Sequence, residues 1–343
     1  MRMRNIFDYT YEELNDYLIS LGEKSFRTKQ IWQWLYIHKV KSFDEMTNLS
    51  KELINKLKNN ISFDYLVIKT KQESNLTNKY LFSLPDGNYI EAVLMKHDYG
   101  LSVCVSSEVG CNMGCKFCES GRLKKIRNLE SFEIVEQIML IEEDLKQRID
   151  SVVVMGIGEP FDNYDNIIKF IKIINNPFGL AIGARHITVS TCGLVPKIKE
   201  FMNLPLQVNL AISLHAPNDE LRSSLMPINK AYPLAELMAC LKEYIQKTNR
   251  RITIEYVMLK EVNDSLECAD KLANLLKGMN AYVNLIPYNE TSHIEFLKSS
   301  KNQIRLFYDY LKKKGINVTI RKEFGSNIDA ACGQLRAKEG ELK

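Results

Sequence analysis

Apolar runs alternate with amphipathic stretches along the chain after residue 100. The run at 151–155 is almost continuously apolar, which is typical of a strand buried on both faces of a parallel sheet. We predict strands at 101–106, 151–155, 186–190, 207–214, 252–258, 282–287 and 317–321, and helices at 131–146, 163–175, 195–203, 233–248, 264–277 and 301–314. This alternation predicts an α/β fold, which is a complete or partial barrel or an open sheet.

The first 100 residues follow two other patterns. Apolar residues at helical spacing predict helices at 11–21, 28–38 and 51–59, with Thr10 as the first N-cap and Gly22 as the first stop. We therefore expect a small helical domain at 1–59. In the segment 60–100, strand-like runs at 79–84 and 88–95 flank Pro85-Asp86-Gly87, which predicts a β-hairpin extension. The rest divides into an α/β core at 101–335 and a polar tail at 336–343.

Composition narrows the class of protein only modestly. The net charge of +4 is compatible with a nucleic-acid partner but does not by itself predict one. Lysines and aromatic residues are interleaved in the helical domain, where they could bind RNA or could form a packed bundle with a solvated face. The first residues lack the apolar core of a signal peptide, and no apolar run reaches membrane-spanning length. We expect a cytoplasmic protein with no membrane partner.

Three of the eight cysteines lie close together, at Cys111, Cys115 and Cys118. The loop that holds them follows the first core strand. Three soft thiolates suit an iron–sulfur cluster in which one iron has no protein ligand. Structural zinc requires a fourth ligand, for which Cys104 is a candidate inside the strand. A disulfide is disfavoured in a reducing compartment. The spacing therefore favours a cluster, with zinc as the next interpretation.

Small polar residues recur where the predicted core strands end. Ligands of parallel α/β proteins collect at these carboxyl ends. Each of these residues alone is most simply a turn or cap residue, and His215 could equally be a structural histidine. Together, beside the cysteines, they predict the lining of a cofactor pocket. The residues are Gly158, Glu159, Ser190, Ser213, Leu214, His215 and Asn289.

Three further residues have plain interpretations when each is considered alone. Glu91 lies among apolar residues of a hairpin strand, and we expect it on the solvent face. If Glu91 were buried, a raised pKa would make it a candidate general base. Cys104, in a strand, and Cys332, in the tail, are both interpreted as packed thiols.

Several motifs taken together resemble the RlmN/Cfr family of radical S-adenosylmethionine (SAM) RNA methyltransferases. They are the spacing C-x3-C-x2-C, with Phe117 before the last cysteine, and the segments 155–160, 213–218, 226–229 and 328–335. The resemblance runs nearly end to end. Segments 26–35 and 46–51 resemble the RlmN branch. The resemblance implies a partial barrel of six β/α units, preceded by a helical domain that binds RNA.

The resemblance also implies a role for each candidate residue. Cys111, Cys115 and Cys118 would hold a 4Fe-4S cluster, and the strand-end residues would bind SAM, with Leu214 contributing backbone. Two SAM molecules would be used per turnover: one would methylate Cys332, and the other would yield a 5′-deoxyadenosyl radical that activates this methyl group. The resulting carbon would add to carbon 2 of adenine. Glu91 would remove the proton there, and Cys104 would attack Cys332 to release the product, leaving a disulfide.

The implied substrates are an adenosine in the peptidyl-transferase region of 23S rRNA and the adenosine 3′ of the anticodon in some tRNAs. The implied partners are an electron donor and a thiol reductant, and we expect a monomer. Two alternatives are a Cfr-type enzyme that methylates carbon 8 and a non-catalytic RNA-binding iron–sulfur protein. The chain departs from the family pattern at Glu119, where small residues are usual, and at Lys124-Lys125, where glycine is usual.

Overall fold

The computed structural model describes residues 3–122, 124–291 and 293–321. Its centre is one ten-stranded sheet with the order β14-β13-β12-β11-β10-β9-β6-β5-β4-β3. From β6 to β14 all neighbours in this order pair in parallel. These strands are β6 (Gly100–Val105), β9 (Ser151–Val154), β10 (Ile187–Thr191), β11 (Asn209–Ser213), β12 (Ile252–Met258), β13 (Ala281–Pro287) and β14 (Asn317–Ile320). All predicted core strands are confirmed, and the linear order leaves the barrel partial.

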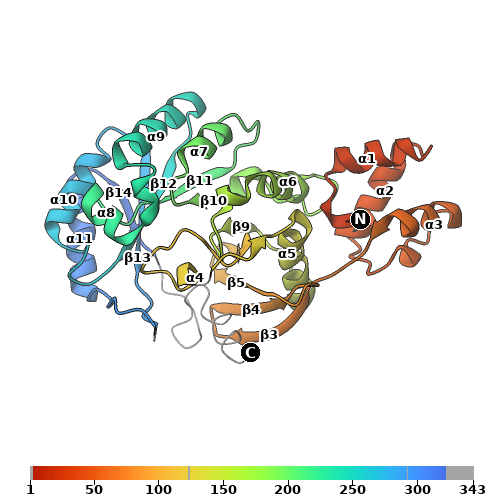
Figure 1. The fold of residues 1–343 in the computed structure, drawn as a ribbon, viewed down its shortest axis with the longest axis horizontal. Coiled ribbons are helices and arrows are strands. Elements are labelled where there is room, and N and C mark those ends of the chain that lie inside the picture. Colours follow the sequence, from red (N-terminus) through yellow and green to blue (C-terminus); the bar gives the residue numbers. More distant parts are fainter. Residues whose placement is uncertain (1–2, 123, 292, 322–343) are drawn as a thin grey trace.

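The helices of the core lie on the outer face of this sheet (Figure 1). The predicted helices are confirmed as α5 (Ser131–Leu145), α6 (Tyr164–Asn175), α7 (Val195–Phe201), α9 (Leu234–Thr248), α10 (Leu266–Leu275) and α11 (Lys301–Lys313). The sequence did not predict α4 (Glu119–Arg122), α8 (Asp219–Leu225), η3 (Pro160–Asn163), η4 (Ala184–His186) or η5 (Pro227–Lys230). Each of these has only one or two turns, which is too short for a periodic apolar stripe to be recognised.

The expected hairpin is larger than predicted and continues the main sheet. Strands β4 (Thr77–Ser83) and β5 (Tyr89–His97) form the predicted antiparallel pair. Strand β5 also pairs with β6, so the extension is joined to the parallel core. A third strand, β3 (Val67–Glu73), completes a meander. It escaped prediction because it is a mostly polar edge strand without an alternating apolar face.

The N-terminal helices form a compact unit at one end of the molecule (Figure 1). They are α1 (Tyr11–Ser20), α2 (Phe26–Tyr36) and α3 (Lys51–Asn60), joined by η1 (Ile6–Asp8), η2 (Phe43–Glu45) and the short parallel pair β1 (Arg4–Asn5) and β2 (Ile61–Ser62). Thr10 caps α1 in a reciprocal capping box with Glu13, as predicted.

This N-terminal unit packs directly on the core. Lys39 Nζ lies 2.7 Å from Glu142 Oε2 of α5. The fully buried ring of Trp32 lies against Gly179, where an added Cβ would come within 2.6 Å of the indole nitrogen. The contact therefore requires glycine at this position. The helices and the sheet share one continuous hydrophobic core.

Two expectations concern the C-terminal segment and membrane-spanning helices. Cys332, the motif 328–335 and the tail 336–343 lie outside the described residues. Within the described ranges, no helix combines the length and the apolar character needed to cross a bilayer.

Candidate active site at the carboxyl ends of the parallel strands

The cysteine loop lies between β7 (Glu108–Val109) and α4. Gly110 and Gly114 have φ of 87° and 64°, so the loop turns where glycine is favoured. The backbone N–H of Lys116 donates to the carbonyl of Leu225 at 2.9 Å, which ties the loop to α8. Cys111, Cys115 and Cys118 line one cavity of about 300 Å³.

The surroundings of the three thiols favour metal-bound over free cysteine. Burial raises the pKa of Cys111 to about 12, and it also raises the pKa values of Cys115 and Cys118. Thiolates at such a site therefore need a compensating positive charge, which metal binding supplies. No three Cys, His, Asp or Glu side chains in the described ranges are arranged around a single metal ion. A cluster, in contrast, takes each cysteine on a separate iron, so the residues fit this group better than zinc.

The same cavity collects most of the predicted strand-end residues. Gly158, Glu159, Ser190, Ser213, His215 and Asn289 line it together with the three cysteines. Leu214 is fully buried and is not among the lining residues. Its N–H donates to the carbonyl of Glu255 at 3.1 Å, and its carbonyl accepts from Arg222 at 3.3 Å. A backbone contribution from Leu214 to ligand binding thus remains a prediction.

The glycines of the 155–160 motif are required by close packing. A Cβ at Gly156 would come within 2.7 Å of the backbone of Val105 and Ser106. Gly158 has φ of 110°, and a Cβ there would meet Glu108 at 2.6 Å. This packing brings the turn after β9 onto the end of β6. The glycines are therefore explained by a tight turn, which leaves Glu159 to supply the polar chemistry.

The Glu159 carboxylate is buried and held by backbone. It accepts hydrogen bonds from the N–H groups of Phe161 at 3.0 Å and Cys192 at 2.8 Å. Its own N–H donates to Glu108 Oε2 at 3.0 Å. Burial raises the pKa of Glu159. The carboxylate links the ends of β9 and β10, where a cationic ligand group would compensate its charge.

His215 lies in the cavity wall with a fixed tautomer. Its Nδ1 accepts a hydrogen bond from the N–H of Val257 at 3.0 Å. Burial, and then the charge of Arg222, lowers the pKa of His215 to about 3. The ring is therefore neutral, and its proton is on Nε2. The backbone is in the left-handed region with φ of 58°, a strained conformation for a non-glycine residue. His215 combines the structural role and the pocket-lining role that the sequence left open.

Arg222 is a site residue that the sequence analysis missed. Its side chain is fully buried in α8. Nη2 donates to the carbonyl of Cys192 at 2.6 Å, and Nη1 donates to Asn229 Oδ1 at 2.8 Å. With its bond to Leu214, the guanidinium joins the ends of β10 and β11. One indication of this role was present in the sequence, because Arg222 lies between the motifs 213–218 and 226–229.

Glu91 is buried, so its expected place on the solvent face is wrong. Its side chain is 3% exposed, and Oε2 lies 3.0 Å from Nζ of the fully buried Lys79. Val93 of β5 pairs with Lys79 of β4 on one side and with Cys104 of β6 on the other. The polar face of an alternating strand is exposed unless another part of the protein covers it. In β5 the consecutive residues Ile90, Glu91 and Ala92 are all buried, so both faces are covered there. Burial raises the pKa of Cys104, whose surroundings include Lys79 and Glu91.

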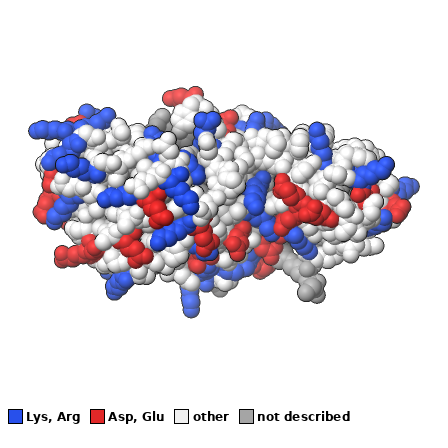
Figure 2. Space-filling model, turned by 90° about the horizontal axis from the view of Figure 1, so that it is seen from above, with Lys and Arg blue, Asp and Glu red and all other residues white. Residues whose placement is uncertain are grey.

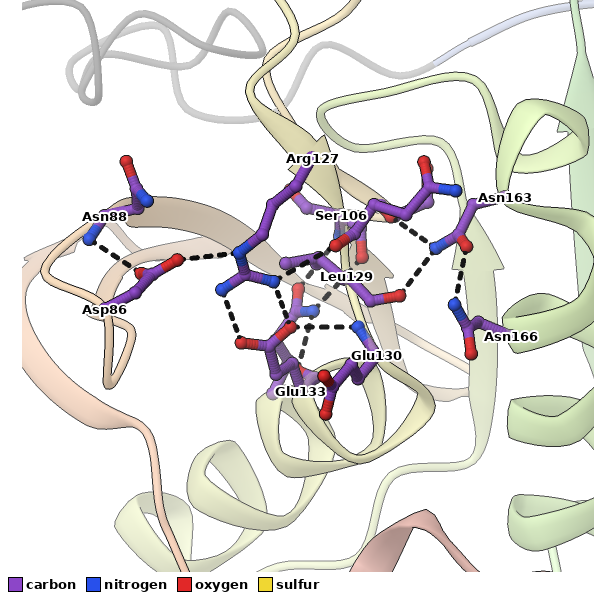
Figure 3. A network of polar contacts seen from close by, with 12 residues as sticks. Asp86, Asn88, Ser106, Arg127, Leu129, Glu130, Glu133, Asn163 and Asn166 are labelled. Atoms are coloured by element: carbon purple, nitrogen blue, oxygen red, sulfur yellow. Dashed lines mark hydrogen bonds and ion pairs between the residues drawn. The ribbon is translucent and has the colours of Figure 1, made fainter. Parts of the chain in front are cut away.

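A polar network fixes the chain just beyond the cysteine loop (Figure 3). Arg127, in β8 (Arg127–Asn128), binds Glu133 of α5 through two bonds of 2.7 Å. Its Nε donates to Asp86 of the β4–β5 turn at 2.6 Å. Asn163 Nδ2 donates to the carbonyl of Leu129 at 2.7 Å. The hairpin, α5 and the turn after β9 are thereby fastened to one segment.

Comparisons with known proteins decide the family. Residues 4–62 match the model of the ribosomal RNA large subunit methyltransferase N-terminal domain, and residues 105–273 match the radical SAM superfamily. The chain is 56% identical to the "Probable dual-specificity RNA methyltransferase RlmN" of Enterococcus faecalis over 99% of this chain and 98% of the relative. The chain belongs to the RlmN family. It is therefore a radical SAM RNA methyltransferase, and its family implies a 4Fe-4S cluster and SAM.

Two further relatives match over nearly their full length. The protein of the same name from Acholeplasma laidlawii is 54% identical over 97% of this chain and 99% of the relative. The crystal structure of a radical SAM methyltransferase from Sphaerobacter thermophilus superposes with a TM-score of 0.91 at 41% identity. It covers 96% of this chain and 98% of that one. The fold is thus that of a radical SAM methyltransferase.

We predict that Arg222→Met destabilises the protein because it removes the buried donors to the Cys192 carbonyl and to Asn229 Oδ1. The expected loss is about 2–4 kcal/mol in the free energy of unfolding, measured by urea denaturation. Arg305→Met removes a cation that is 64% exposed and is the matched control. The control should stay within about 0.5 kcal/mol of the parent. An equal loss of unfolding free energy in the two variants would contradict the structural role of Arg222.

Proposed function

We propose that this enzyme methylates carbon 2 of one adenosine in the peptidyl-transferase region of 23S rRNA. We propose the same reaction for the adenosine 3′ of the anticodon in some tRNAs. The match of residues 4–62 to an rRNA methyltransferase domain supports an RNA substrate. The word "dual-specificity" in the names of relatives supports a second one. Mapping of the methylated position would distinguish this reaction from the Cfr-type reaction at carbon 8.

The observation that carries this proposal is the buried Glu91–Lys79 pair beside Cys104. A module that only bound RNA would not need a carboxylate and a lysine buried together at 3.0 Å, since such pairs are costly to bury. The charges of Glu91, Lys79 and Arg321 all act on the Cys104 thiol. Arg321 also lines the cavity of the three cysteines. The thiol therefore lies near Arg321, a lining residue of the cavity in which the cofactors would be held.

Each of these residues has a distinct task in the proposed reaction. Cys111, Cys115 and Cys118 would hold the cluster, and the strand-end residues would hold SAM. Bound together, these groups supply the methyl carbon and the one-electron chemistry that an unreactive aromatic carbon requires. Glu91 accepts the proton that leaves carbon 2 of the adenine, and the one electron left over from the radical addition would return to the bound cofactors. Lys79 Nζ, 3.0 Å from Oε2, holds the buried carboxylate in position for that transfer.

Product release is assigned to the two thiols. After loss of its proton, Cys104 attacks the sulfur of Cys332, which carries the adenine through a methylene carbon. The sulfur–sulfur bond forms as the carbon–sulfur bond breaks. The carbon takes the electron pair and then a proton, which gives the methyl group. An external dithiol reduces the resulting disulfide before the next turnover.

Recognition of RNA is assigned to the N-terminal domain, residues 1–59. Carbon 2 of a stacked adenine is inaccessible, so the base must be unstacked to reach the cavity. Basic and acidic side chains are interspersed over the face in Figure 2. Shape and a few phosphate contacts therefore suit this face better than a uniform positive field. We propose a cytoplasmic monomer that uses two SAM molecules per turnover and takes electrons from an external donor.

We predict opposite failures for the two reactive thiols. Cys332→Ala should abolish methylation, because the carrier of the methyl carbon is missing. Cys104→Ala should accumulate a covalent protein–RNA adduct, because the sulfur that releases it is missing. Denaturing gels and mass mapping of the modified adenosine on rRNA and tRNA fragments measure both. Normal turnover by both variants would refute the thiol mechanism.

We predict that the buried pair behaves as one unit in stability. Lys79→Met removes the cation 3.0 Å from the buried carboxylate and should cost about 3–5 kcal/mol in unfolding free energy. Adding Glu91→Gln to that variant should recover part of the loss, because the buried negative charge is then removed as well. Urea denaturation of the two single variants and the double variant measures the coupling. A double variant that is less stable than Lys79→Met would rule out the pairing.

A further inference from the structure

The segment 119–125 follows the last cysteine and contains the two departures from the family pattern. Glu119 and Lys125 are both largely buried, with side chains 1% and 15% exposed. Burying a charge is costly unless it is paired, so each must have specific partners. The partners of the two residues lie on different walls of the cavity.

Glu119 reaches the wall formed after β13. Its Oε2 accepts a hydrogen bond from Thr291 Oγ1 at 3.0 Å, and Oε1 lies 2.9 Å from His293 Nδ1. Arg122 of α4 donates to the same Oε1 at 2.7 Å. Thr291 lines the cavity and lies two residues beyond Asn289, which lines it as well. The carboxylate therefore connects the residue directly after Cys118 to the Asn289 loop.

Lys125 contacts the residues that support the cavity wall formed after β9. Its Nζ lies 2.6 Å from Glu108 Oε1 and 2.7 Å from Asp162 Oδ2. The other Glu108 oxygen accepts from the N–H of Glu159 at 3.0 Å. The N–H of Asp162 donates to the carbonyl of Glu159, also at 3.0 Å. The ammonium thus holds the Gly158-Glu159 turn through both of its partners.

We propose that Glu119 and Lys125 are positioning residues that fix the Asn289 loop and the Gly158-Glu159 turn relative to the cysteine loop, and so determine the affinity for SAM. A ligand that contacts both walls and the cluster binds well only when all three are held at the correct separation. Charge-assisted hydrogen bonds from one short segment provide that restraint. The proposal rests on the proposed function, because it takes this cavity to be the SAM site.

Hydrogen exchange of the full-length protein before cluster loading tests the restraint without any cofactor. Glu119→Ala should raise exchange in peptides covering 288–298 by about tenfold, as expected for one lost charge-assisted contact, and leave 156–162 unchanged. Lys125→Met should do the reverse. Lys124→Met removes the neighbouring lysine, which is exposed, and should change neither peptide. Exchange in α1, far from the site, reports whether each variant is folded.

Affinity for SAM is then measured by equilibrium dialysis on the cluster-loaded proteins. Glu119→Ala and Lys125→Met should each weaken binding by about tenfold, and Lys124→Met should not. Glu119→Gln keeps one acceptor oxygen but removes the charge, so it should retain more affinity than Glu119→Ala. Unchanged exchange in both wall peptides would overturn the proposal, as would unchanged SAM affinity in both variants. A parent protein that fails to bind SAM would instead refute the proposed function, while the exchange contrast still decides the restraint.

Discussion

Parallel pairing of the strands from β6 to β14 is the constraint on which the site depends. Parallel neighbours bring all their carboxyl ends to one edge, so residues far apart in sequence must meet there. Cys111 follows the first of these strands, His215 follows the fourth, and Asn289 follows the sixth. All three line one cavity. Without this parallel pairing, the three cysteines would not share a cavity with the strand-end residues.

Buried charge is the second feature that organises the site. The Lys79–Glu91 pair is almost completely removed from solvent, Lys125 and Glu108 are largely buried, and the buried Arg222 guanidinium donates to carbonyls and an amide oxygen. Such groups add little net stability compared with well-packed apolar residues. The presence of Lys125 and Arg222 is better explained by the geometry they impose. Arg222 joins the segments that follow β10 and β11, and Lys125 joins the cysteine loop to the turn after β9.

The regular elements could be predicted from the sequence because their signals are local. Continuous apolar runs identified the parallel strands, and Thr10 marked the start of α1 through its capping box. The cysteine spacing and the strand-end residues also identified the lining of the cavity. Edge strand β3 and the short helix α8 lacked such signals. Their existence depends on neighbours supplied by the rest of the fold.

The errors at the site have a common physical origin. Glu91 has the sequence context of an alternating strand, and only the tertiary structure covers its face and supplies Lys79. The role of Arg222 depends on carbonyls from two other strand ends. Glu119 meets Thr291 and His293 across more than half of the core's length in sequence. Contacts of this kind leave no periodic signal in one sequence, so unusual residue types were the only clue.

The central claim is that Cys111, Cys115 and Cys118 would hold a cluster and that the strand-end residues lining the same cavity would bind SAM. The most direct measurement is electron paramagnetic resonance of the reduced protein after anaerobic loading with iron and sulfide, recorded with and without SAM. The account predicts about four irons per chain, one cluster signal and a clear change in that signal when SAM is added. A protein that stays colourless and iron-free, or a cluster signal that SAM leaves unchanged, would contradict it.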